Sequence, residues 1–241
     1  VYVIARIFHA GSELLNPSFR TAFIRQKKRM FLVLSVVLAA VGIRVSLSLG
    51  TKVLMVSLGA YLLGGMYILQ RITPRANSMI IRLLSSIPAS KDFITAAAWT
   101  TVAVGIPFIH QGGVDVNRNT FSALLFVFLL AFYRTVTFDF SDIEGDRMVG
   151  EDTLPVYFGK KKAGLILKAI IVVIGIILFS LPVGESAFLG FCLLSLTVYL
   201  MFIHRYLDRG GIHDEIVTEI AIDSAFIVAG LLGGLSYFWV Y

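Results

Sequence analysis

Hydrophobic residues occur along this chain in long runs, and most charged residues lie in the stretches between them. Because a helix of about 20 mostly apolar residues crosses the hydrocarbon core of a bilayer, each run of that length predicts a spanning helix. Seven runs qualify, at about 31–50, 52–70, 93–110, 119–138, 163–182, 186–204 and 217–240. An eighth run, at 1–8, is too short to span and looks like the tail of a longer helix. The pattern predicts an all-α, multi-pass transmembrane helix bundle that forms a single membrane domain over 1–241.

The connections between the runs differ in length and charge. Four long stretches hold most of the lysines and arginines: 1–30, 71–92, 139–162 and 205–216. Three short stretches hold few of them: those near 51, 111–118 and 183–185. An excess of Lys and Arg marks the cytoplasmic loops of membrane proteins. We therefore expect a protein of the cell inner (plasma) membrane whose long basic loops are cytoplasmic.

Composition narrows the class of protein. Hydrophobic residues make up 57% of the 241 residues and charged residues 15%, against about 25% charged in soluble domains, which excludes a water-soluble enzyme. The net charge of +6 does not indicate nucleic acid, because the basic residues lie between apolar runs rather than on one patch. Cys192 is the one cysteine, so no disulfide can form within the chain.

The stretch 139–155, DFSDIEGDRMVGEDTLP, holds six acidic residues beside an apolar run. Asp139, Asp142 and Asp146 are spaced i, i+3 and i+7, so on one continuous helix they would share an arc of about 60°. Three carboxylates on one face repel each other unless a cation lies among them. Mg²⁺ binds carboxylate oxygens and often substrate phosphates as well. One interpretation is therefore a helix end that holds Mg²⁺ for a diphosphate.

Other interpretations of the acidic stretch exist. A calcium-binding EF-hand loop that starts at Asp139 is excluded, because its ligand positions 3, 5 and 12 would be Ser141, Ile143 and Gly150. An acidic loop in solvent, with no binding role, fits the spacing alone. A proton or ion pathway fits less well, because the acids lie at the end of an apolar run. A transporter is disfavoured, because no pair of broken helices recurs in two halves of the chain.

The segment 139–163, DFSDIEGDRMVGEDTLPVYFGKKKA, resembles the second aspartate-rich motif of the UbiA superfamily of intramembrane prenyltransferases. The segment 85–108, SSIPASKDFITAAAWTTVAVGIPF, is similar to the loop and helix before that motif in some members. The resemblance implies a nine-helix fold around a central cavity open to the cytoplasmic side, with 31–241 as helices three to nine. It also implies Mg²⁺-dependent transfer of a prenyl group from a polyprenyl diphosphate to an aromatic or lipid acceptor, with membrane lipids and no nucleic acid as further partners.

The resemblance assigns roles to residues of the motif. Asp139, Asp142 and Asp146 correspond to the catalytic aspartates that bind Mg²⁺. Lys91 matches a lysine of the related loop, and it and Arg147, which follows the last aspartate, are candidates for diphosphate binding. Such contacts would be charge-assisted hydrogen bonds.

Several polar residues lie outside the motif. Arg134, inside an apolar run, is a further candidate for diphosphate binding, and it needs a partner or a water-filled cavity there. Asp223, early in the last run, either lines the cavity or pairs with a base. The lysines at 160–162 indicate contact with lipid headgroups, and His110 and His204 look like interfacial residues.

The chain departs from the family at the first motif, Asn-x-x-x-Asp-x-x-x-Asp. Ala5, His9 and Glu13 have its spacing but not its residues, so His9 and Glu13 are candidate replacement ligands. We expect binding of a prenyl diphosphate with weak turnover, because half of the metal platform is altered. The alternative is a truncated or divergent member that binds isoprenoid lipid or a partner protein without catalysis.

Overall fold

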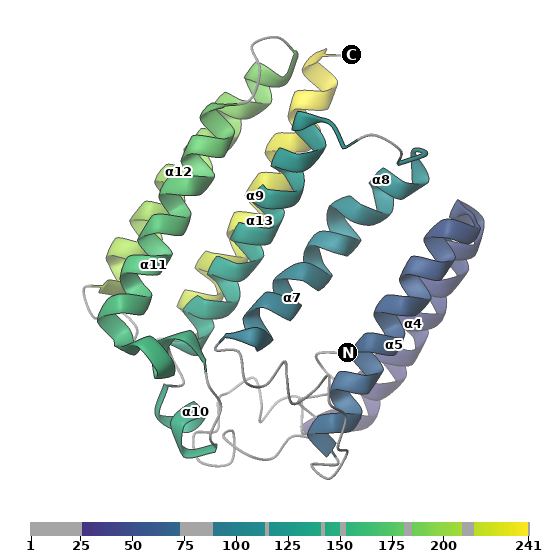
Figure 1. Cartoon of the computed structure of the whole chain (residues 1–241), viewed down its shortest axis with the longest axis horizontal. Coiled ribbons are helices and arrows are strands. Elements are labelled where there is room, and N and C mark those ends of the chain that lie inside the picture. The colour runs from purple at the N-terminus through teal and green to yellow at the C-terminus, as the bar shows by residue number, and fades with distance from the viewer. Residues whose placement is uncertain are drawn as a thin grey trace. The chain divides into compact units, whose positions relative to one another are not determined.

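The computed structural model describes residues 26–72, 89–113, 116–140, 143–149, 153–180, 185–208 and 215–240. Every regular element in this part of the chain is a helix (Figure 1). The elements are α4 (Lys28–Leu49), α5 (Thr51–Ile72), α7 (Ser90–Thr100), the π-helical turn η1 (Thr101–Gly105), α8 (Ile106–His110), α9 (Arg118–Asp139), α10 (Ile143–Val149), α11 (Leu154–Phe179), α12 (Glu185–Asp208) and α13 (Glu215–Val240).

Each predicted spanning run overlaps helical structure. Five stretches of the described part are long and apolar enough to cross a membrane: Lys28–Leu49, Asp92–His110, Arg118–Asp139, Leu154–Phe179 and Val217–Gly234. The two other predicted runs form α5 and α12, which are 22 and 24 residues long. The prediction of an all-α, multi-pass protein is confirmed. A central cavity, and the side on which it opens, stay predictions.

The run predicted at 93–110 is not a uniform helix. The π-helical turn η1 separates α7 from α8, and Pro107 follows at the start of α8. Proline has no N–H for the carbonyl four residues earlier, and its ring crowds that carbonyl. A π-helical turn is one of the local adjustments that accommodate a proline in a spanning helix.

The helices belong to two compact units, and each is described by itself. The first unit holds α4, α5, η1, α8 and α10 apart from Ile143. Within it, α4 packs against α5 and α5 against α8. The Ser46 hydroxyl lies 2.8 Å from the Gly42 carbonyl oxygen and 2.9 Å from the Ser57 hydroxyl. Small side chains thus bring α4 and α5 close together, as is common between helices in lipid.

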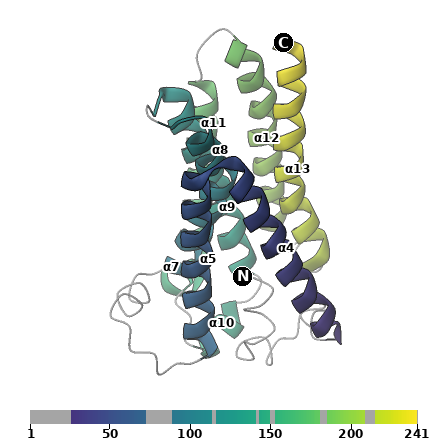
Figure 2. The ribbon, with the colours of Figure 1, turned by 90° about the vertical axis from the view of Figure 1, so that its right-hand side faces the viewer.

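The second unit holds α7 apart from Ser90, together with α9, α11, α12 and α13. Within it, α11 packs against both α9 and α12, and α12 lies beside α13 (Figure 2). The core side of α11 carries Leu167, Ile171 and Ile174, which are spaced as one helix face and are almost fully buried. On the same helix, a Cβ at Gly175 would lie 3.2 Å from the Thr197 methyl group, so glycine permits the close approach of α12.

The helix α11 begins well before the predicted run at 163–182. Its first turn contains Pro155, and Gly159 interrupts it with φ 79° and ψ 155°. This conformation is open to glycine and strained for other residues. The lysines at 160–162 therefore lie in the first turn after the break and are exposed. Hydropathy alone located the apolar part of the helix but not its polar beginning.

Candidate functional site

The C-terminal end of α9 carries the first predicted metal ligand. Asp139 is the last residue of α9, and its side chain is buried, with 7% of its surface exposed. The Phe140 N–H donates to the Thr137 carbonyl oxygen at 3.3 Å. This hydrogen bond, from residue i+3 to residue i as in a 3₁₀-helix, tightens the last turn of the helix. The helix α9 therefore ends at Asp139.

The first turn of α10 carries another predicted ligand. Asp146 is 4% exposed, whereas Glu144, two residues earlier, is exposed. A negative charge in the first turn of a helix is favoured by the helix dipole. Both Asp139 and Asp146 also interact with other residues of the chain. Burial thus separates these two aspartates from Glu144.

The placement of the three aspartates on one face of a single helix is wrong. The helix α9 ends at Asp139 and α10 begins at Ile143, so the helical register does not continue from the first aspartate to the third. Asp142 lies outside the described residues, and Asp139 and Asp146 belong to different units. Their role as metal ligands stays a prediction.

Two buried carboxylates are the candidate donors for a metal ion in the described part of the chain. In the described part of the chain, no three His, Cys, Asp or Glu side chains form a group able to hold one. Asp139 and Asp146 nevertheless supply buried carboxylate oxygens, the hard donors that Mg²⁺ prefers. The chemistry of each of these two side chains fits the ion.

The basic residues predicted to bind diphosphate lie in three different helices. Lys91 is the second residue of α7, and its side chain lies outside the described part. Arg147, near the end of α10, is exposed. Arg134 lies in α9 and is partly buried, with 22% of its side chain exposed. His9 and Glu13, the candidate replacement ligands, lie outside the described residues.

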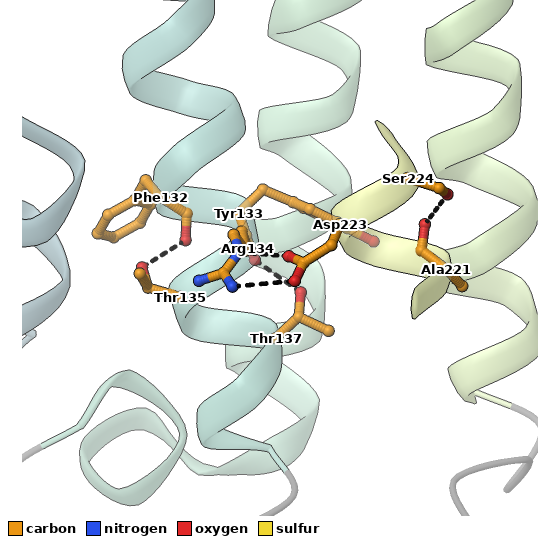
Figure 3. Close-up of polar contacts among 8 residues, drawn as sticks. All are labelled: Phe132, Tyr133, Arg134, Thr135, Thr137, Ala221, Asp223 and Ser224. Carbon is orange, nitrogen blue, oxygen red and sulfur yellow. Dashed lines mark hydrogen bonds and ion pairs between the residues drawn. The ribbon is translucent and has the colours of Figure 1, made fainter. Parts of the chain in front are cut away.

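Arg134 has the partner that its position in an apolar run requires. Its Nε donates to Asp223 Oδ1 at 2.5 Å, and its Nη2 donates to Asp223 Oδ2 at 3.2 Å (Figure 3). The guanidinium carbon also lies 4.6 Å from the centre of the Phe138 ring. Asp223 thus pairs with a base, and its place in a cavity stays a prediction. The residues are 89 positions apart, on α9 and α13.

His204 does not have the environment that the sequence predicts for an interfacial residue. It is 5% exposed, and its ring centre lies 6.4 Å from that of Tyr133. Its place near the end of a spanning helix suggested an interface, but the direction of its side chain is set by the packing of α12 near α9. His110 is exposed, and its Nδ1 lies 3.0 Å from the Leu49 carbonyl oxygen.

The burial of Asp92 was not predicted from the sequence. This residue lies in the first turn of α7 and has no exposed surface. The next residue, Phe93, lies 5.6 Å from the Phe128 ring and 4.9 Å from the Phe132 ring, centre to centre. The available signal was an acid at the beginning of an apolar helix, where the helix dipole favours a negative charge.

The sequence profile of the UbiA prenyltransferase family matches residues 25–215. The chain therefore belongs to the UbiA prenyltransferase family, and the resemblance carried by the acidic stretch is confirmed.

Two similar proteins are the digeranylgeranylglyceryl phosphate synthases of Pyrococcus horikoshii and Pyrococcus abyssi. Identity to the first is 31% over 152 residues, which are 63% of this chain and 48% of the relative. Identity to the second is 30% over 152 residues, which are 62% of this chain and 48% of the relative. The chain thus spans about half the length of the curated relatives it matches. No solved structure matches the chain significantly.

Proposed function

We propose that this chain is an intramembrane prenyltransferase that binds a polyprenyl diphosphate with Mg²⁺ and transfers its prenyl group to a lipid acceptor. The observation that carries this function is the family match over 25–215, which includes the acidic stretch as well as the spanning helices around it. The burial of Asp139 and Asp146 in that stretch supports it. Carboxylate oxygens are the hard donors that Mg²⁺ prefers, and a metal-bound diphosphate would use them.

The proposed reaction requires stabilisation of the charge on the diphosphate leaving group and exclusion of water from the allylic carbon. The carbon–oxygen bond of the donor breaks, and the diphosphate leaves with the electron pair. Mg²⁺, held by Asp139, Asp142 and Asp146, would offset the charge that develops on this leaving group. Lys91 and Arg147 would donate hydrogen bonds to diphosphate oxygens. The acceptor oxygen then bonds to the allylic carbon and releases its proton.

The prenyl tail needs an apolar surface that keeps water from the allylic carbon. Phe93, Phe128 and Phe132 offer one in the second unit, where their rings contact each other and about half of Phe93 is exposed. Aromatic side chains bury a large apolar area. A tail packed on them would lie beside α9, the helix that ends at Asp139.

The acceptor is proposed from the relatives. Their name describes a product with two geranylgeranyl groups on glyceryl phosphate. A prenyltransferase with that product adds the second group to a glyceryl phosphate lipid that already carries one. We accordingly assign geranylgeranyl diphosphate as donor and geranylgeranylglyceryl phosphate as acceptor, in place of an aromatic acceptor. The site would face the cytoplasm, the side of the long basic loops.

Binding of a geranylgeranyl diphosphate analogue to purified protein, with and without Mg²⁺, tests the proposed site. Binding should require Mg²⁺ and be lost in Asp142→Ala, because this change removes the middle carboxylate. Glu144→Gln is the matched control, since Glu144 is an exposed acid of the same stretch, and it should bind as the wild type does. Binding that depends on neither Mg²⁺ nor Asp142 would overturn the proposed site.

Transfer is then measured by mass spectrometry with geranylgeranylglyceryl phosphate and with an aromatic hydroxy acid as competing acceptors. The lipid product should form in preference and should disappear when the metal is chelated. Turnover should be slow, because Ala5, His9 and Glu13 have the spacing of the family's first motif without its residues. Mg²⁺-dependent binding with no transfer to either acceptor would favour the noncatalytic alternative.

A further inference from the structure

The ion pair between Arg134 and Asp223 joins two spanning helices of the second unit. We infer that this α9–α13 ion pair positions the end of α9, and therefore Asp139, for metal binding, and that Arg134 is not a diphosphate ligand. Arg134 is thus a positioning residue rather than a catalytic one. This role rests on the proposed function, because it assumes that Asp139 binds Mg²⁺.

On α9, the ion pair is connected to Asp139 through Phe138. Arg134 precedes Asp139 by five residues, so the two lie about 140° apart around the helix and about 7.5 Å apart along it. The guanidinium carbon of Arg134 lies 4.6 Å from the centre of the Phe138 ring, within the range of a cation–π interaction. Because Phe138 is the neighbour of Asp139, a shift of Arg134 would disturb the last turn of α9.

On α13, the ion pair is anchored to α12. The Tyr199 hydroxyl lies 3.0 Å from the Ala221 carbonyl oxygen and 2.7 Å from the Ser224 hydroxyl. These two residues lie on either side of Asp223 in the sequence, and the Ser224 hydroxyl donates to the Ala221 carbonyl oxygen at 2.7 Å (Figure 3). The backbone that carries Asp223 is therefore tied to a neighbouring helix, which makes it a fixed point for Arg134.

The ion pair matters for the position of α9 because α9 has few other direct contacts with α13. The helix α9 packs mainly on α11, and α13 packs mainly on α12. Few residues of α9 and α13 lie close to each other. Two parallel hydrogen bonds between a guanidinium and a carboxylate fix both distance and orientation. The ion pair therefore sets how α9 lies relative to α13 at the level of its last two turns.

The same geometry disfavours contact between Arg134 and the diphosphate. Two donors of the guanidinium are already directed at the Asp223 carboxylate. A diphosphate brought to the remaining donors would meet the negative charge of Asp223. The helical angle also places Arg134 well away from the side of α9 that carries Asp139. The charged pair is instead the kind of expensive polar feature that a spanning helix keeps for function.

The test measures the Mg²⁺ concentration that gives half-maximal binding of a fluorescent geranylgeranyl diphosphate analogue. Asp223→Asn and Arg134→Lys should each raise this concentration about ten-fold, the size of effect seen when groups behind a metal ligand are altered. The double variant should be no worse than either single variant, because both remove one interaction. Thr135→Val is the matched control on α9, since its hydroxyl bonds only to the Phe132 carbonyl oxygen in the described part, and it should leave the value unchanged.

The outcomes separate the possible roles. If Arg134 binds diphosphate, its variants will weaken binding while Asp223→Asn will not, which would overturn the inference. A loss of thermal stability with an unchanged Mg²⁺ requirement would also overturn it, because that result indicates packing alone. If Asp223→Asn does not fold, Asp223→Glu keeps the charge, moves the carboxylate and should still raise the Mg²⁺ requirement. A wild-type protein without Mg²⁺-dependent binding would overturn both this role and the proposed function.

Discussion

Replacing Gly159 with alanine should destabilise the protein through its backbone alone. Gly159 lies within α11 at φ 79° and ψ 155°, between a short first segment and the long apolar part of the helix. Residues other than glycine rarely adopt this conformation, because their Cβ crowds the backbone. The break directs the chain from the acidic stretch into the spanning part of α11.

The size of the effect follows from the surroundings of the residue. A Cβ added at Gly159 would have no heavy atom within 4 Å, so the cost is that of the conformation, about 1–3 kcal/mol. Gly164 is the matched control in the same helix, because a Cβ there also meets nothing within 4 Å and its φ is not positive. Alanine at a regular helical position stabilises by about 0.5–1 kcal/mol relative to glycine. The two variants should therefore differ by about 1.5–4 kcal/mol.

Thermal unfolding in detergent, followed at one heating rate for both variants, measures this difference. For a protein of this size, 1 kcal/mol corresponds to a shift of about 2–4 °C in Tm. Gly159→Ala should lower the Tm by several degrees, and Gly164→Ala should leave it unchanged or raise it slightly. Equal Tm values for the two variants would refute the reasoning, because they would mean that α11 runs through residue 159 as a regular helix.

Three further predictions concern packing and topology. A Cβ at Gly175 would lie 3.2 Å from the Thr197 methyl group, so Gly175→Leu should lower the Tm more than Gly175→Ala, and equal effects would exclude a close contact of α11 with α12. The Thr197 hydroxyl is buried and has no hydrogen-bond partner among the described residues, so Thr197→Val should leave stability unchanged or raise it by up to about 1 kcal/mol; a clear loss in the same assay would contradict this. A reporter inserted after Gly159 should read cytoplasmic and one within 111–118 external, and the reverse pattern would contradict the predicted orientation.

The positions of the spanning helices could be predicted from the sequence because of a strong physical constraint. Backbone N–H and C=O groups cannot remain unbonded in hydrocarbon, so a long apolar run must form a helix. The run predicted at 119–138 is accordingly the helix Arg118–Asp139. The polar beginning of α11 could not be predicted from hydropathy, because a helix in water or at the headgroups need not be apolar. The family, too, was readable from the acidic stretch.

The register of the aspartates could not be predicted from their spacing. An i, i+3, i+7 pattern identifies one helix face only if the helix continues, and α9 ends at Asp139. Nothing in the hydropathy of a polar stretch requires continuation, because water can satisfy its backbone groups there. The chemistry of the candidate ligands was therefore apparent from the residue types, whereas their arrangement was not.

The partner of Arg134 was decided by tertiary structure. The sequence indicated that an arginine within an apolar run needs a compensating charge, because an unpaired charge is costly in a membrane. Asp223 is 89 positions away, and although its place early in an apolar run marks it as an acid that needs a role, nothing in the sequence links it with Arg134. Likewise, His204 is buried because of how α12 packs, although its place near a helix end suggested an interface. Residue types and hydropathy determine which groups must be buried or paired, and only the packing of the helices determines with which partner.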